Sequence, residues 1–299
     1  MKLVNYGISG AEQPGILSRN DTVIPLIPIL EEYGITYCDM PQLLAWLPHA
    51  QELLEEAMRG AWKGVAVPDI RLGPPVPRPG LILAAGGNYA AHTAEVAPGQ
   101  EQNIPSSPVF FAKAPTAISG PYDSVVRPPE TAALDYECEL AVVIGRGGHR
   151  IPRAEALSHV AGYMIANDVT ARDVFIGESK RNPIFLQSLK GKGFPTFCPT
   201  GPWLLTADEV PDPRGLRLRT WVNDELRQDA EVADMIFDIP TLISEASTCF
   251  RLRPGDVILT GTPAGVGFAM NPPRLLAPGD VIEMEITGLG IMTTTVVDE

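Results

Sequence analysis

The sequence has few cysteines, no cluster of basic residues and no long apolar run. Its four cysteines, Cys38, Cys138, Cys198 and Cys249, are widely spaced and form no CxxC pair, which is typical of small core residues in a reduced, cytoplasmic protein. Residues 1–7 lack the apolar segment of a signal peptide and no stretch is long enough to span a bilayer, so we expect no membrane partner. With a net charge of −13 and no basic patch, we expect no nucleic-acid partner either.

The composition is that of an ordinary globular enzyme. Hydrophobic residues make up 45% of the 299 residues and charged residues 20%, and this length allows one large domain or two smaller ones. The 30 prolines and 28 glycines predict many turns and short strands rather than a helical bundle. A proline-rich linker at 71–79 is the expected boundary between a small N-terminal accessory domain (1–70) and a main domain (80–299).

An acidic stretch followed by an apolar one is the most informative feature of the chain. Residues 134–140 alternate between apolar and acidic or polar side chains, and residues 141–145 are wholly apolar, which predicts one strand that runs into the core. Asp135, Glu137 and Glu139 would then share one face. Like charges side by side need a cation, and hard oxygen ligands suit magnesium, manganese or calcium. The alternative is a solvated strand face.

Two further groups of polar residues are candidates for chemistry. His92 and Glu95 lie three apart on an expected helix, where the carboxylate can orient the imidazole as a general base, although a surface pair is the alternative. The turn-rich segment 97–108 reads either as a mobile lid or as a plain surface loop. Asp168 ends an apolar strand, where it could project at a sheet edge or cap the next segment.

Lysines and glycines mark three other places. Lys113 ends a predicted strand, and Lys192 lies in a glycine-broken loop, where a buried lysine could bind an anion or polarise a carbonyl. The segment 261–267 is rich in glycine but is not a P-loop, since no Gly-Lys-Ser/Thr follows. Its glycines permit close backbone approach to a ligand, and the Thr262 hydroxyl could donate to one. Solvated lysines and a turn without a ligand are the alternatives.

The order and spacing of these motifs closely resemble the fumarylacetoacetate hydrolase family over about residues 80–297. The motifs are Asn88-Tyr89-x-x-His92-x-x-Glu95, Phe111-x-Lys113, Asp135-Tyr136-Glu137-x-Glu139, Asn167-Asp168-Val169-Thr170-Ala171-Arg172-Asp173, Lys190-Gly191-Lys192-Gly193-Phe194, Gly201-Pro202-Trp203 and Gly261-Thr262-Pro263-x-Gly265-Val266-Gly267. The resemblance implies an α+β fold, with a mixed β-roll or β-sandwich catalytic domain and a small, variable N-terminal α/β domain. It also implies a homodimer.

The resemblance further implies roles for individual residues. By position, the metal ligands are Glu137, Glu139 and Asp168, which would hold Mg²⁺ or Mn²⁺, with Ca²⁺ as a substitute in crystals. Asp135 is then expected to support these ligands rather than to bind the ion. The remaining assignments are a water-activating pair, His92 and Glu95; a residue that assists at the developing enolate or oxyanion, Lys192; and substrate-side groups, Tyr89, Lys113, Arg172 and Thr262.

These parts suit a metal-dependent hydrolase that cleaves a C–C bond in an acylpyruvate-like or other 1,3-diketo acid. Water deprotonated by His92 would attack the distal carbonyl, and cleavage would leave an enolate stabilised by the metal and Lys192. The same enolate chemistry serves a lyase or isomerase, such as a 2-oxo acid decarboxylase or a hydroxymuconate-type isomerase. A catalytically silent metal-binding protein is a third hypothesis.

One position departs from the family pattern. Phe175 stands where many relatives of this family have a glutamine, two residues after the Arg172-Asp173 pair. Loss of a polar contact there favours a less polar substrate and puts a dicarboxylate substrate in doubt. Lys180 and Arg181, in the stretch 176–184, are the residues that could offset this loss.

Overall fold

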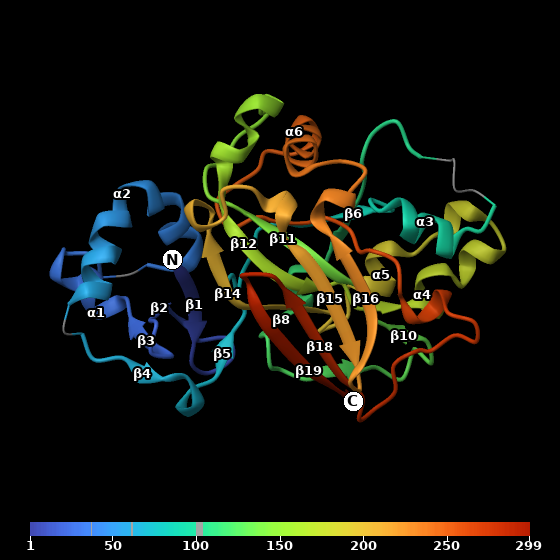
Figure 1. Cartoon of the computed structure of the whole chain (residues 1–299), viewed down its shortest axis with the longest axis horizontal. Helices are drawn as coiled ribbons and strands as arrows, with labels where there is room; N and C mark the ends of the chain where they lie inside the picture. Colours follow the sequence, from blue (N-terminus) through green and yellow to red (C-terminus); the bar gives the residue numbers. More distant parts are fainter. Residues whose placement is uncertain (37, 61, 100–103) are drawn as a thin grey trace.

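The chain is built around one large mixed β-sheet, which extends from the N-terminal strands at the left of Figure 1 to β6 at the right. The computed structural model describes residues 1–36, 38–60, 62–99 and 104–299. Ten strands follow the order β4-β3-β2-β1-β14-β12-β11-β17-β6-β7, with β5 beside β1 and β8 beside β14. The bounds are Lys2–Tyr6 (β1), Gln13–Leu17 (β2), Thr22–Pro25 (β3), Val65–Ala66 (β4), Leu72–Gly73 (β5), Ile82–Gly86 (β6), Val109–Lys113 (β7), Ile118–Ser119 (β8), Cys138–Ile144 (β11), Val160–Asn167 (β12), Cys198–Thr206 (β14) and Val257–Leu259 (β17).

A second sheet of five strands lies in front of the first in Figure 1, in the order β16-β15-β18-β19-β9. Its strands are Val125–Arg127 (β9), Arg217–Val222 (β15), Glu225–Glu231 (β16), Val281–Ile286 (β18) and Gly290–Asp298 (β19). This sheet contains two antiparallel hairpins, β15–β16 and β18–β19. Asn223 and Asp224 join β15 to β16 with φ of 50° and 65°, the left-handed values that a tight two-residue hairpin turn requires.

The centre of the large sheet explains why its strands form where they do. Every residue of β11 is buried, and β11 pairs antiparallel with β12, for example Leu140 opposite Ile165. A strand that is covered on both faces needs a continuous apolar run, which residues 140–144 supply. Together with the few short helices, these sheets confirm the expected α+β fold class.

The acidic stretch does not form the single strand that its alternation predicts. Leu134–Asp135 (β10) pairs with Thr170–Ala171 (β13) in a separate two-stranded sheet, whereas β11 begins only at Cys138. The expectation of one continuous strand is wrong because the Glu137 N–H donates to the Asn167 side chain (3.0 Å) instead of a backbone carbonyl, so the ladder is interrupted. The solvated-face alternative is also wrong, since all three carboxylates are buried.

The helices are short apart from one at each end of the chain. The Asp238 side chain accepts a hydrogen bond from Thr241 N and so caps the start of α6. Residues Arg153–His159 form a 3₁₀ helix. The α-helices are Ile27–Glu32 (α1), Met40–Arg59 (α2), Ala90–Val96 (α3), Arg172–Ile176 (α4), Ser188–Lys192 (α5) and Ile239–Cys249 (α6). None of the helices in the described ranges is long and apolar enough to cross a membrane.

The N-terminal part shares its main sheet with the rest of the chain. β1 pairs antiparallel with β14, with Lys2 opposite Leu205, and β5 from the proline-rich segment pairs with β1. Side chains of α2 such as Leu43 and Leu44 belong to the same buried cluster as the central strands. The division at 71–79 therefore stays a prediction.

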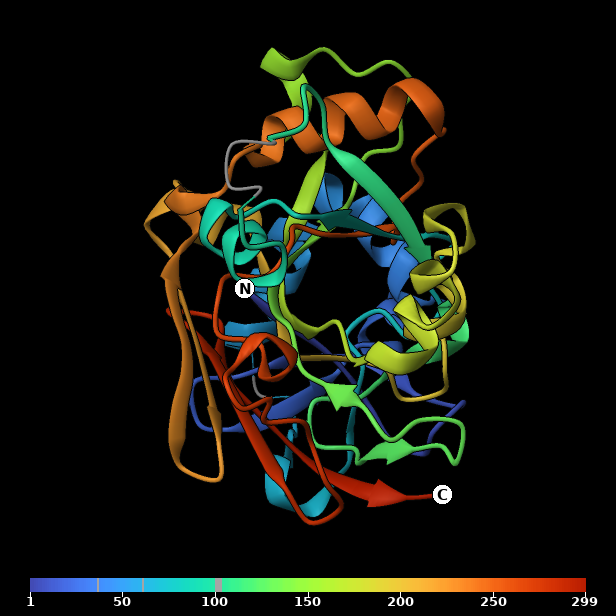
Figure 2. The same cartoon turned by 90° about the vertical axis from the view of Figure 1, so that its right-hand side faces the viewer.

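The helices α3, α4 and α5 lie together at the right-hand end in Figure 1. Figure 2 turns this end toward the viewer, with α3 (teal) on one side and α4 and α5 (yellow) on the other. Glu139 lies on β11, Glu137 directly precedes β11, and Asp168 directly follows β12.

Candidate functional site

Strand pairing brings the three predicted carboxylates together. Cys138 lies opposite Asn167 where β11 and β12 meet, and the hydrogen bond from Asp168 N to Glu137 O (2.8 Å) adds one further rung. Glu139 is two residues from Glu137 and so projects to the same side. One oxygen from each of Glu137, Glu139 and Asp168 lies within 4.8 Å of the others.

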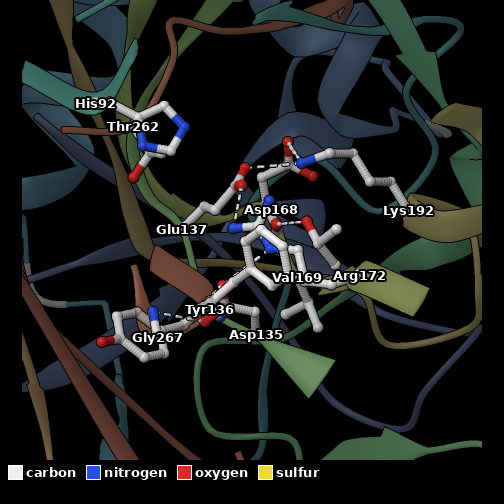
Figure 3. A network of polar contacts seen from close by, with 12 residues as sticks. His92, Asp135, Tyr136, Glu137, Asp168, Val169, Arg172, Lys192, Thr262 and Gly267 are labelled. Carbon is white, nitrogen blue, oxygen red and sulfur yellow. Dashed lines mark hydrogen bonds and ion pairs between the residues drawn. The ribbon is translucent and has the colours of Figure 1, made fainter. Parts of the chain in front are cut away.

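Two of these carboxylates are bound by buried cations. The Lys192 ammonium lies 2.7 Å from both Glu137 Oε2 and Asp168 Oδ2 (Figure 3). The Lys113 ammonium donates to Asp168 Oδ1 at 2.5 Å. Arg172 pairs through Nη2 with Glu137 (2.7 Å) and through Nε with Asp135 (2.8 Å). Each of these cations therefore fixes the orientation of a carboxylate.

Asp135 does not join the cluster of carboxylates. Besides Arg172, its side chain accepts hydrogen bonds from the N–H groups of Gly267 (2.9 Å) and Phe268 (3.1 Å). It therefore ties Arg172 to the segment after the glycine-rich turn, in agreement with a supporting role.

Glu139 has no cation partner among the described residues. Its Oε2 accepts a hydrogen bond from Gly261 N at 2.6 Å. Burial, together with the nearby charges of Asp168 and Glu137, raises the pKa of Glu139 well above its ordinary value. Glu137 behaves in the opposite way: burial alone would raise its pKa, but Lys192 and Arg172 outweigh burial and lower it. Among the described residues, the charge of an ionised Glu139 is thus not offset by an ion pair.

The donor set fits a divalent cation. Four buried carboxylates (Asp135, Glu137, Glu139 and Asp168) face three buried cations (Lys113, Arg172 and Lys192), which leaves one negative charge when all four carboxylates are ionised. A divalent ion would change this to one positive charge, which suits an anionic substrate. Three hard oxygen donors match Mg²⁺ or Mn²⁺ rather than a softer metal.

Metal affinity should increase with pH. Because only the carboxylate form binds a metal, the ion must displace the proton that Glu139 retains to higher pH than an ordinary glutamic acid. Mn²⁺ binding should therefore tighten as the pH rises above the ordinary range of a glutamic acid, and it should release a proton. Calorimetry in two buffers of different ionisation enthalpy measures this release, and an affinity independent of pH would contradict it.

The predicted histidine–glutamate pair lies on α3, at the cavity. His92 Nδ1 is 2.8 Å from Glu95 Oε1, and Glu95 Oε2 accepts a hydrogen bond from Gly265 N (2.8 Å). Gly265 has φ of +107°, and a Cβ there would collide with the carbonyl oxygen of Arg227. The glycine-rich turn therefore holds the pair in place through a backbone N–H that only glycine can present there.

His92 lines a cavity of about 430 Å³ together with Glu137 and Glu139, whereas Glu95 and Asp168 are not part of the described lining. Predicted catalytic, substrate-binding and metal-binding residues all occur in the lining of this cavity: His92, Glu137, Glu139, Arg172, Lys192 and Thr262. The other lining residues are Ala85, Gly86, Gly87, Thr93, Val96, Phe111, Phe175, Ile176 and Phe268. Figure 3 shows His92 and Lys192 on opposite sides of Glu137 in that view.

Other predicted site residues lie elsewhere or are already engaged. Tyr89 and Lys113 are buried and are not part of the described cavity lining. The Thr262 hydroxyl donates to Cys138 O (3.0 Å) and accepts from Gln228 Nε2 (2.8 Å). Their roles as substrate contacts stay predictions. The expected lid, 97–108, falls partly outside the described residues, at 100–103.

Gln228, which the sequence analysis did not identify, forms hydrogen bonds with several segments that carry site residues. Its Oε1 accepts hydrogen bonds from Cys138 N (3.1 Å) and Thr220 Oγ1 (2.9 Å), while its Nε2 donates to Thr262 and Pro263. It therefore fixes both the strand that carries Glu139 and the glycine-rich turn. The only sequence signal was a glutamine in a hairpin strand, which is too common to be informative.

Known proteins share both the sequence and the fold. The family described as fumarylacetoacetate (FAA) hydrolase, C-terminal, matches residues 81–297. Oxaloacetate tautomerase YisK of Bacillus subtilis (strain 168) is 39% identical over 258 residues, which are 84% of this chain and 82% of that protein.

Several solved structures match the whole chain. One, from Mycobacterium abscessus, is described as a probable 2-hydroxyhepta-2,4-diene-1,7-dioate isomerase; it covers 100% of this chain and 99% of its own, with 41% identity and a TM-score of 0.82. Another is maleylpyruvate hydrolase from Sphingobium sp. SYK-6 in complex with manganese(II) and pyruvate, with 31% identity, the same coverage and a TM-score of 0.80. The chain belongs to the fumarylacetoacetate hydrolase family of enzymes.

Proposed function

We propose that this enzyme cleaves a C–C bond in an acylpyruvate-like 1,3-diketo acid by hydrolysis, and that it requires Mg²⁺ or Mn²⁺. The observation that carries the proposal is that His92, oriented by Glu95, lines the same cavity as Glu137 and Glu139. A base and carboxylates that would hold a Lewis-acidic ion, if they share one cavity, can act on the two carbonyls of one substrate. Manganese and pyruvate in the related maleylpyruvate hydrolase add support.

Glu137, Glu139 and Asp168 would hold the ion. When bound, it supplies a Lewis acid that polarises carbonyl oxygens. Their burial and the absence of a cation beside Glu139 in the described chain support this assignment.

His92 would activate the attacking water. Because an ionised Glu95 can only accept, His92 Nδ1 carries the proton, and the lone pair on Nε2 serves as the base. The imidazole takes one proton from water, and the oxygen attacks the distal carbonyl. The C–C bond then breaks, its electron pair remains on the pyruvate fragment as an enolate, and protonation of that enolate completes the reaction.

Lys192 would stabilise negative charge that develops on substrate oxygen. Burial alone lowers its pKa, but Asp168 and Glu137 outweigh burial and raise it, so the ammonium keeps its proton. A charged donor fixed at the cavity wall loses little on reorganisation during the reaction.

Tautomerisation of a 2-oxo acid is the second candidate. It is favoured by the similarity to YisK, an oxaloacetate tautomerase. This reaction needs proton transfer to and from an enol but no attacking water. A homodimer in the cytoplasm stays our prediction for the assembly and location.

Products distinguish the two candidates. We expect the Mn²⁺-loaded enzyme to convert 2,4-dioxoheptanoate into equal amounts of pyruvate and butanoate, measured by chromatography beside the loss of enol absorbance. Enol–keto conversion of oxaloacetate without C–C cleavage of any acylpyruvate would replace hydrolysis by tautomerisation.

A further inference from the structure

Both permanently charged cations in the described cavity lining already form ion pairs with carboxylates of the protein. Lys192 contacts Glu137 and Asp168, and Arg172 contacts Glu137 and Asp135, all at 2.7–2.8 Å. The side chains of Lys192 and Arg172 are only 3% and 6% exposed. Neither cation can turn toward a second, distant carboxylate without leaving a buried anion unpaired, which is costly.

Aromatic rings border the same two cations. The Lys192 ammonium is 5.1 Å from the centre of the Phe111 ring and 5.6 Å from that of Phe175. The Arg172 guanidinium carbon is 5.7 Å from the Phe268 ring. These distances are within cation–π range, and they place apolar surface where a free cation would be needed to bind a dianion.

The position of Phe175 is fixed by its backbone. Gln187 N donates to Phe175 O (3.0 Å), and a Cβ on Gly191 would lie 2.6 Å from the Phe175 Cβ. α5 therefore packs directly against Phe175, which keeps this ring in the cavity wall. Val96 and Ile176 extend the apolar lining.

The described cavity lining contains no lysine or arginine other than Lys192 and Arg172. Residues 97–108, which follow α3, contain no lysine or arginine and one glutamate. Lys180 and Arg181 are exposed and are not part of the described lining, and Arg181 pairs with Glu178 at 3.3 Å. The apolar part of the cavity therefore lacks a partner for a carboxylate.

We propose that the substrate carries a single carboxylate, at the Glu137–Glu139 end of the cavity, and an uncharged apolar acyl group that packs against Phe175 and Phe111. This inference rests on the proposed function and narrows its substrate class to monocarboxylic acylpyruvates. A second carboxylate at the far end would lose its hydration without gaining a partner. Phe175 is then the residue that determines specificity.

Matched acids that differ only in a terminal methyl or carboxylate test this inference. Calorimetry with the Mn²⁺-loaded full chain measures binding of 2-oxoheptanoate and 2-oxoheptanedioate, which have no second carbonyl to be cleaved. Turnover is measured with 2,4-dioxoheptanoate and 2,4-dioxoheptanedioate. We expect the monocarboxylate of each pair to be preferred by about tenfold or more in Kd and in kcat/KM.

Two substitutions at one position sharpen the test. Phe175→Arg adds a cation at the apolar end and should shift both ratios toward the dicarboxylate by about tenfold or more, whereas Phe175→Leu should keep the wild-type preference. If Phe175→Arg fails to fold, as judged by circular dichroism, the Kd and kcat/KM ratios of the wild-type enzyme are sufficient to test the inference.

The outcomes separate this inference from the proposed function. A wild-type preference for the dicarboxylate in binding overturns the inference, and cleavage of that dicarboxylate would leave the hydrolase proposal intact. A monocarboxylate preference in binding without cleavage of either diketo acid supports the inference on the cavity and refutes hydrolysis.

Discussion

His92→Ala should lower the rate of acylpyruvate hydrolysis by about 10²–10⁴-fold. The substitution removes the base that Glu95 orients, while Glu139 on β11, Glu137 just before β11 and Asp168 just after β12 keep their positions. The loss should appear in kcat rather than in Mn²⁺ affinity, because His92 is not among the predicted ligands. The measurement is pyruvate release from 2,4-dioxoheptanoate, with Mn²⁺ binding followed in parallel.

The same substitution at His149, an exposed histidine, is the matched control and should leave hydrolysis unchanged. Enol–keto conversion should survive better than hydrolysis in His92→Ala, because it needs no attacking water. A variant that hydrolyses acylpyruvates at the wild-type rate would refute the role of His92.

Glu139→Gln should lower turnover about a thousandfold or more, because Lewis-acid stabilisation is worth several kcal/mol and each 1.4 kcal/mol is about tenfold in rate. The amide oxygen can still accept the hydrogen bond from Gly261 N, so the local fold is kept. What is lost is one of the three anionic oxygens that would hold the ion. Turnover at saturating Mn²⁺ measures this loss.

Although Glu139→Gln should lower turnover, it should raise the thermal stability of the metal-free protein. A raised pKa in the folded state means that the contribution of Glu139 to stability is full below its unfolded-state pKa and is lost as pH rises through its folded-state value. Glutamine avoids this loss, so metal-free Glu139→Gln should unfold at a higher temperature than wild type near neutral pH, and the difference should vanish in acid. Glu130→Gln, on the exposed surface, is the control and should change neither activity nor stability.

The sequence allowed the carboxylates to be predicted but not the way the chain joins them. Alternation at 134–140 correctly indicated that acidic residues approach the core, since Glu137 and Glu139 both lie there. It could not indicate the interruption before β11, because that depends on a side-chain acceptor, Asn167, about thirty residues away. Asp135 consequently accepts hydrogen bonds from Arg172 and from the backbone N–H groups of Gly267 and Phe268 instead of joining the carboxylate cluster.

Long-range partners explain the other differences as well. Gln228 contacts Cys138 and Thr262, which are distant in sequence, so no local pattern could reveal its position. The pairing of β1 with β14 spans about two hundred residues and joins parts that the proline-rich segment seemed to separate. The His92–Glu95 pair, in contrast, was predictable from its spacing alone, because both residues lie on α3.

A titration of Mn²⁺ into the metal-free enzyme tests the central claim most directly. Bound Mn²⁺ is counted by electron paramagnetic resonance while pyruvate release from 2,4-dioxoheptanoate is measured in the same samples. We predict that the rate rises from background in proportion to occupancy and reaches its plateau at one ion per chain, and that Glu139→Gln shows neither tight binding nor the rise. Full activity in metal-free protein, or full activity in Glu139→Gln without bound Mn²⁺, would contradict the account.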